Sequence, residues 1–185
     1  MELDKIFTSH MVFAAKKPIR IYGTGKGSVT IRFAGCVKQY MSDSEKWMLE
    51  LPPMEYGGPY VLEAAFEDRT EVLCDIYIGE VFLFSGQSNM QFRLMDTEIP
   101  KEEYRSNPNV RLFSTATVRN TDKFVPDDGW VICDKEYVGY WSALAYLASV
   151  EVSLAKDVAI GVIACYQGAS AIESWVPENT FEKIG

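Results

Sequence analysis

The residues of this chain that are best suited to chemistry lie at positions 86–90 (Gly-Gln-Ser-Asn-Met), directly after an apolar run at residues 76–84. A serine on a small polar turn past the end of a buried strand has an exposed hydroxyl, and backbone N–H groups of the turn can face a developing oxyanion. The pattern is not a Gly-x-Ser-x-Gly elbow, because Met90 stands in place of the second glycine. It predicts either a hydrolase nucleophile or a polar β-turn in which Ser88 and Asn89 only satisfy backbone groups.

A second stretch has the same organisation. Residues 160–165 have the apolar pattern of a buried strand, and residues 166–175 (Tyr-Gln-Gly-Ala-Ser-Ala-Ile-Glu-Ser-Trp) follow it. Together, the two blocks resemble those of the SGNH hydrolases, in the form used by sialate O-acetylesterases and related carbohydrate acetylesterases. That family's second block reads Gly-Gly-Ser/Thr-x-Ile-Glu-x-Trp, and the positions that match it here are Gly168, Ser170, Ile172, Glu173 and Trp175. Ala169 replaces the second glycine, one small residue for another.

The resemblance implies roles for particular residues. Ser88 would be the nucleophile, and the N–H groups of Ser88 and Gly168 would be the oxyanion donors available in this chain. The polar side chains beside them are candidates for substrate binding, although each could instead hold its own loop; they are Gln87, Asn89, Gln167 and Glu173. Trp175 could stack on a sugar ring or anchor the block in the core.

A serine hydrolase also needs a general base, and the only histidine of the chain is His10. The family's histidine comes from an Asp-x-x-His block late in the hydrolase domain, and no Asp-x-x-His occurs here. His10 instead falls in the N-terminal region, where we expect a surface turn residue. The resemblance therefore implies an N-terminal portion of an acetylesterase that is inactive in isolation.

Two patterns of secondary structure divide the chain. Residues 1–78 contain short apolar runs separated by turn residues, which predicts a β-sandwich-like module. Residues 79–185 alternate strands with helical segments, which predicts a parallel sheet in an α/β domain. The resemblance implies that this second domain is part of an SGNH-type, flavodoxin-like, three-layer fold.

Within the second region, we expect strands near residues 80–85, 110–114 and 160–165, and an irregular segment over 115–139. A helix is expected to begin near Ser142. Its spacing of apolar residues predicts a face toward the sheet formed by Leu144, Leu147, Val150 and Leu154.

Composition limits the partners. A net charge of −8 and a pI near 4.8 argue against nucleic acid or an anionic membrane surface. Four cysteines without a Cys-x-x-Cys pair, together with one histidine, predict buried free thiols and no metal or other cofactor; they are Cys36, Cys74, Cys133 and Cys165. No signal peptide and no membrane-spanning run is visible, which predicts a cytoplasmic setting.

The sequence therefore predicts removal of O-acetyl groups from a carbohydrate such as sialic acid by a serine nucleophile. A non-catalytic carbohydrate-binding or interaction module is the alternative. A parallel sheet with only three strands would expose apolar surface, so we also expect self-association or pairing with a chain that supplies the rest of the domain.

Overall fold

The computed structural model describes residues 1–115, 129–177 and 180. Its strands are β1 (Glu2–Leu3), β2 (Val12–Ala14), β3 (Ile19–Thr24), β4 (Gly27–Phe33), β5 (Cys36–Ser42), β6 (Lys46–Leu51), β7 (Gly57–Phe66), β8 (Thr70–Gly86), β9 (Asn107–Ser114), β10 (Trp130–Cys133) and β11 (Ile160–Tyr166). Its helices are α1 (Ser88–Gln91), α2 (Ala143–Lys156) and the short η1 (Leu94–Asp96), η2 (Lys101–Glu103), η3 (Val138–Tyr140) and η4 (Ile172–Trp175).

The N-terminal strands form two facing sheets. A three-stranded sheet has the order β1-β3-β6, and the strands β8-β7-β4-β5 form one end of a larger sheet. Buried and exposed residues alternate along β3 and β6, as strands with one face on a core require. Side chains from both sheets, such as Ile21, Leu49 and Ile31, share one hydrophobic core.

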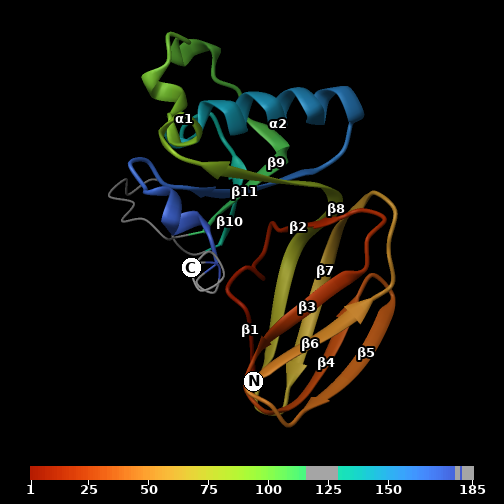
Figure 1. The fold of residues 1–185 in the computed structure, drawn as a ribbon. Coiled ribbons are helices and arrows are strands. Elements are labelled where there is room, and N and C mark those ends of the chain that lie inside the picture. The colour runs from red at the N-terminus through yellow and green to blue at the C-terminus, as the bar shows by residue number, and fades with distance from the viewer. Residues whose placement is uncertain (116–128, 178–179, 181–185) are drawn as a thin grey trace.

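Strand β8 joins the two halves of the molecule (Figure 1). Its first half pairs with β7 in antiparallel fashion, and residues Glu80 to Gly86 pair in parallel with β11. The predicted boundary between residues 78 and 79 therefore falls inside one continuous 17-residue strand. At this junction β2 also pairs with β8, and Ala159, the residue before β11, bonds to Glu80. The strands β2, β8 and β11 therefore meet around Gly79.

The second half contains the sheet order β10-β9-β11-β8. The three predicted strands are confirmed as β8, β9 and β11, which are mutually parallel. The prediction of an irregular segment over 115–139 is wrong at β10, which pairs antiparallel with β9, and at η3. Residues 116–128 of that segment lie outside the described residues. The sheet is thus mixed, because β10 runs antiparallel to β9 while β8, β9 and β11 run parallel to one another.

Helix α2 begins where the sequence predicted, because the Ser142 hydroxyl accepts a hydrogen bond from the Ala145 N–H at 3.3 Å. The predicted buried face is confirmed only at Val150, which is half-buried and packs against the core of this half, and it is wrong for the three leucines. Leu144, Leu147 and Leu154 are exposed, and the residues that face the sheet are Ala143, Ala145, Tyr146, Ser149 and Ser153. Small side chains let the helix backbone approach the sheet closely, and the leucines are left on the outer side.

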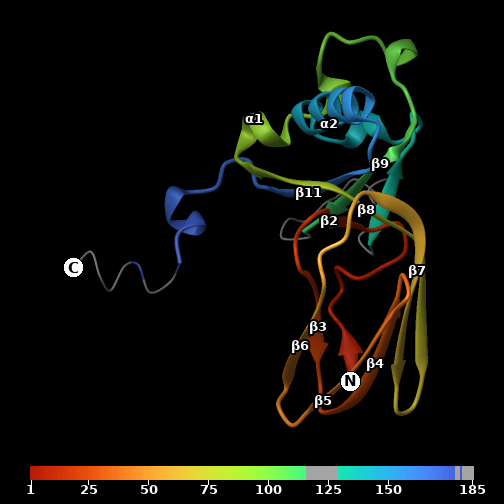
Figure 2. The same ribbon diagram turned by 90° about the vertical axis from the view of Figure 1, so that its right-hand side faces the viewer.

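The two faces of the second sheet are covered differently (Figure 2). Helix α2 packs on one face, where Leu112, Val162 and Trp141 belong to one core cluster. On the other face, Phe113 and Trp130 belong to the core of the N-terminal sheets. Among the described residues, those N-terminal strands occupy the side where a second helical layer was expected.

Candidate active site

The ends of β8 and β11 bring the two sequence blocks together. Gly86 pairs with Tyr166 at the end of the parallel ladder, and the Gln167 N–H donates to the Gly86 carbonyl at 2.9 Å. A β-carbon placed on Gly168 would lie 3.4 Å from the Ser88 Oγ. Two blocks that are about 80 residues apart in sequence therefore form one site, because carboxyl ends of adjacent parallel strands meet at one edge of the sheet.

Ser88 is the first residue of the single-turn helix α1, and it is exposed. Gly86 has φ of +146°, a conformation that favours glycine and turns the chain sharply out of β8. The N–H groups of Met90 and Gln91 both donate to the Gln87 carbonyl at 3.0 Å, which holds the turn. Among the described residues, the Ser88 hydroxyl has no hydrogen-bond partner.

Gln91 is a site residue that our sequence reasoning missed. Its Oε1 accepts a hydrogen bond from the Gly168 N–H at 2.5 Å, so this predicted oxyanion donor is already engaged. A substrate oxygen at Gly168 would have to displace the Gln91 side chain. The signal was the position of Gln91, one helical turn after Ser88, which places both side chains on the same side of α1.

The other predicted substrate-binding residues divide into two pairs. Gln87 donates through Nε2 to the Ser170 carbonyl, and Gln167 donates through Nε2 to the Gly168 carbonyl at 3.1 Å. These two amides therefore hold the loops, one of the two roles left open. Asn89 and Glu173 are exposed, and neither side chain makes a hydrogen bond to the rest of the described chain.

Hydrogen bonds of the Ser170 side chain hold the loop that follows β11. The Ser170 hydroxyl donates to the Gln167 carbonyl at 2.8 Å and accepts from the Trp175 Nε1 at 2.8 Å. Trp175 is 37% exposed, so it fastens the loop at the surface rather than anchoring it in the core. Ala169 has φ of +58°, which explains why the matching family position is normally glycine.

His10 lies in a different cluster. Its Nδ1 is 2.8 Å from the Asp75 Oδ2, which also accepts from the Arg111 Nη2 at 3.3 Å. Asp75 precedes the end of β8 by 11 residues, or roughly 35 Å along an extended strand. His10 is therefore a partner of Asp75 at the junction between the two halves.

The negative charge of the Asp75 carboxylate compensates the positive charge of the buried Arg111. Arg111 is 2% exposed and lies 4.0 Å over the Tyr77 ring. Burial of the Asp75 carboxyl opposes its ionisation, but the His10 hydrogen bond and the Arg111 charge outweigh this, so the pKa of Asp75 is lowered.

We expect Asp75→Asn to lower the free energy of unfolding most at neutral pH. A carboxyl whose pKa is lower in the folded state contributes stability above its unfolded pKa of about 3.9 and loses it as pH falls through the folded value. The stability gap between wild type and Asp75→Asn should therefore stay nearly constant from pH 7 to about pH 5 and close as the pH falls below about 3.9. Urea unfolding at each pH measures the gap, and a constant gap would contradict the assignment.

The cysteines are mostly not buried, contrary to the prediction. Only Cys133 is buried, and this burial raises the pKa of its thiol to about 11. Cys74 is exposed, and Cys36 and Cys165 are half-buried. In the described part of the chain, no group of three or more potential metal ligands comes together, and no helix is long and apolar enough to span a membrane.

Comparison with solved structures identifies the class of fold. The chain superposes on the crystal structure of a carbohydrate acetylesterase from Xanthomonas citri with a TM-score of 0.86 and 22% identity, covering 97% of this chain and 43% of that one. The fold is thus a mixed-sheet α/β fold of the kind seen in that carbohydrate acetylesterase. No family model matches the chain.

Sequence relatives are more specific. The chain is 26% identical to the sialate O-acetylesterase of Rattus norvegicus, over 89% of this chain and 35% of the relative. It is 27% identical to that of Homo sapiens, over 80% of this chain and 32% of the relative. These matches confirm the resemblance to the sialate O-acetylesterases, and the chain spans about a third of the length of those relatives.

Proposed function

We propose that this protein takes part in the hydrolysis of O-acetyl esters on a carbohydrate, with Ser88 as the nucleophile. The observation that carries the proposal is the meeting of Ser88 and Gly168 at the carboxyl ends of two adjacent parallel strands. The names of the relatives support an ester hydrolase over the alternative of a non-catalytic binding module. Sialic acid is the carbohydrate that those names suggest.

In the proposed reaction, the Ser88 Oγ attacks the acetyl carbonyl, and the new negative charge lies on the carbonyl oxygen. The Ser88 N–H and, once Gln91 has turned away, the Gly168 N–H would stabilise that charge. A base must accept the Ser88 proton as attack begins. The only histidine bonds to Asp75, so we propose that the base comes from polypeptide outside these 185 residues.

We further propose that residues 1–78 form a β-sandwich-like module and that residues 79–185 contribute to an SGNH-type hydrolase domain. The two facing N-terminal sheets and the parallel β8-β11-β9 ladder support this division. The strand β8 would then be shared by both units, so that the module fixes the orientation of the nucleophile strand.

A fluorophosphonate test addresses the nucleophile directly. In the complete polypeptide that the gene encodes, we expect the probe to label the peptide that contains Ser88, because only an activated serine reacts with it. Ser88→Ala should remove the label, whereas His10→Ala should leave it unchanged. Mass spectrometry of the labelled peptide gives the result, and a label on another serine would contradict the proposed role.

We also propose that the 185-residue chain associates, with itself or with a chain that completes the hydrolase domain. Residues 80–86 of β8 pair on one side only within the described structure, and Phe82 and Leu83 are exposed there. The leucines of α2 add exposed apolar surface. Sedimentation velocity at tens of micromolar should show species larger than a monomer, and an ideal monomer would count against this proposal.

A further inference from the structure

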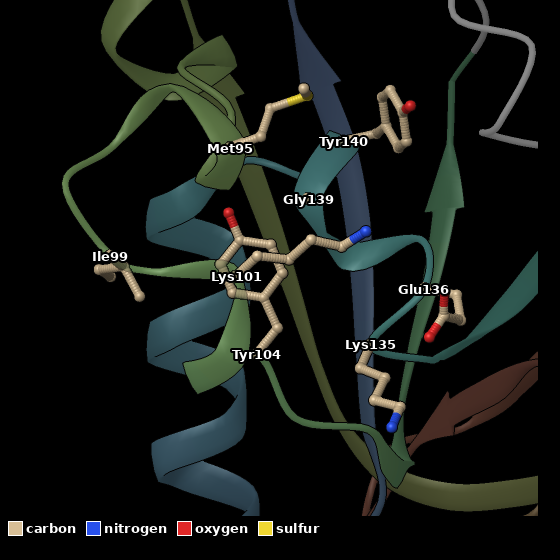
Figure 3. Close-up of a pocket in the computed structure, with 8 residues that line it drawn as sticks. All are labelled: Met95, Ile99, Lys101, Tyr104, Lys135, Glu136, Gly139 and Tyr140. Atoms are coloured by element: carbon tan, nitrogen blue, oxygen red, sulfur yellow. The ribbon is translucent and has the colours of Figure 1, made fainter.

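The helical layer contains a groove that the proposed hydrolysis does not use. It encloses about 330 Å³ and runs between η1, η2 and η3 (Figure 3). Its floor includes Tyr104, which is 6% exposed, and Gly139. A β-carbon on Gly139 would lie 3.4 Å from the Tyr104 ring and 3.6 Å from the Met95 Cβ, so this glycine keeps the floor open.

The rim of the groove carries two lysines and one glutamate, Glu136. Lys101 extends from η2 and Lys135 comes from the segment that leads into η3 (Figure 3). Neither ammonium group forms an ion pair with a carboxylate of the described residues, in contrast to Lys156, which bonds Glu80 at 2.7 Å. Two lysines without an ion pair in the described part of the chain, against the single carboxylate of Glu136, favour an anionic ligand in this groove.

The frame beneath the lysines is rigid. The Lys135 N–H donates to the Ser106 hydroxyl at 2.9 Å, which ties the two walls together. The Arg105 N–H donates to the Tyr146 hydroxyl at 2.9 Å, and the Arg105 Nη1 donates to the Glu102 carbonyl at 2.7 Å. These bonds hold the backbone beside both lysines, so less conformational freedom is lost there when a ligand binds.

The lysine end of the groove lies opposite the serine site. Lys101 lies before Asn107, the first residue of β9. Lys135 follows β10, and the last residue of β10, Cys133, pairs with Asn107. Both lysines therefore lie near the first residue of β9. Ser88 and Gly168 follow the last residues of β8 and β11, which run parallel to β9. A ligand at the lysines therefore binds at the other end of the sheet.

We propose that this groove is a second carbohydrate site, which binds a sugar acid; the choice of a sugar rests on the proposed function. The ammonium groups of Lys101 and Lys135 attract the sugar carboxylate, and the less polar face of the ring lies on the exposed Met95 side chain. The Glu136 carboxylate accepts a hydrogen bond from a sugar hydroxyl. This site is independent of Ser88, so it holds the glycan without taking part in ester cleavage.

The test compares a negatively charged sugar acid with its uncharged methyl ester. N-acetylneuraminic acid and its methyl ester are titrated into the 185-residue chain, with amide NMR shifts as the readout. The acid should bind in the millimolar range and lose affinity as salt is added, and the ester should bind about tenfold more weakly. Equal affinities, or no binding of the acid at any soluble concentration, would overturn the proposal.

Matched variants locate the site. The double variant Lys101→Met and Lys135→Met should weaken binding of the acid by about tenfold, whereas Lys101→Arg and Lys135→Arg together should retain most of it. Lys17→Met, which removes an exposed lysine outside the groove, should leave affinity unchanged. Loss of binding in Ser88→Ala with retention in the methionine double variant would place the ligand at the serine site and refute the groove. Loss of esterase activity alone would bear only on the proposed hydrolysis.

Discussion

Replacement of Ser88 by alanine is expected to lower acetate release from an O-acetylated sugar by about 10⁴-fold or more in the complete polypeptide. In the proposed reaction the hydroxyl oxygen forms the bond to the acetyl carbon, and alanine would leave only water as nucleophile. The residual rate would come from oxyanion stabilisation and binding by groups such as the Gly168 N–H. The measurement is the initial rate of acetate release from an O-acetylated sialic acid at saturating substrate.

The matched control for this experiment is His10→Ala, which should change the rate by less than about twofold, because His10 bonds Asp75 rather than Ser88. The 185-residue chain alone should show negligible turnover of p-nitrophenyl acetate, since its single histidine bonds Asp75 and does not accept the Ser88 proton. Robust turnover by this chain that His10→Ala abolishes would contradict the assignment of the base.

Gly79→Ala is expected to lower the free energy of unfolding by about 3 kcal/mol, or the melting temperature by about 10 °C. A β-carbon at Gly79 would lie 2.0 Å from the Ala159 carbonyl oxygen and 3.0 Å from the Val12 Cγ1. That oxygen also accepts the Glu80 N–H at 2.9 Å, so the two strands cannot separate without loss of a ladder bond. Thermal unfolding followed by circular dichroism measures the effect.

Gly139→Ala is the matched control, because its β-carbon would meet Tyr104 at an ordinary contact distance of 3.4 Å. Its melting temperature should change by no more than about 3 °C. If Gly79→Ala lowered the melting temperature no more than Gly139→Ala, the close approach of β2, β8 and β11 would not require a glycine at position 79.

Local patterns in the sequence were sufficient for several features. The apolar runs predicted β8, β9 and β11, and the alternation along β4 follows its burial. Ser142 predicted the start of α2, because an N-cap acts on residues within the same helical turn. Glycine and serine at the ends of two apolar runs also identified the residues that meet in the site. All of these signals act over a few residues.

The tertiary structure decided what depends on distant segments. The leucine face of α2 was predicted to be buried, but Ala145 and Ser149 allow a closer approach to the sheet, so packing selected the small-residue side. The bond between Gln91 and Gly168 and the pairing of His10 with Asp75 join residues separated by 77 and 65 positions. No local pattern carries such contacts, because they arise only when the strands that bear them are paired in register.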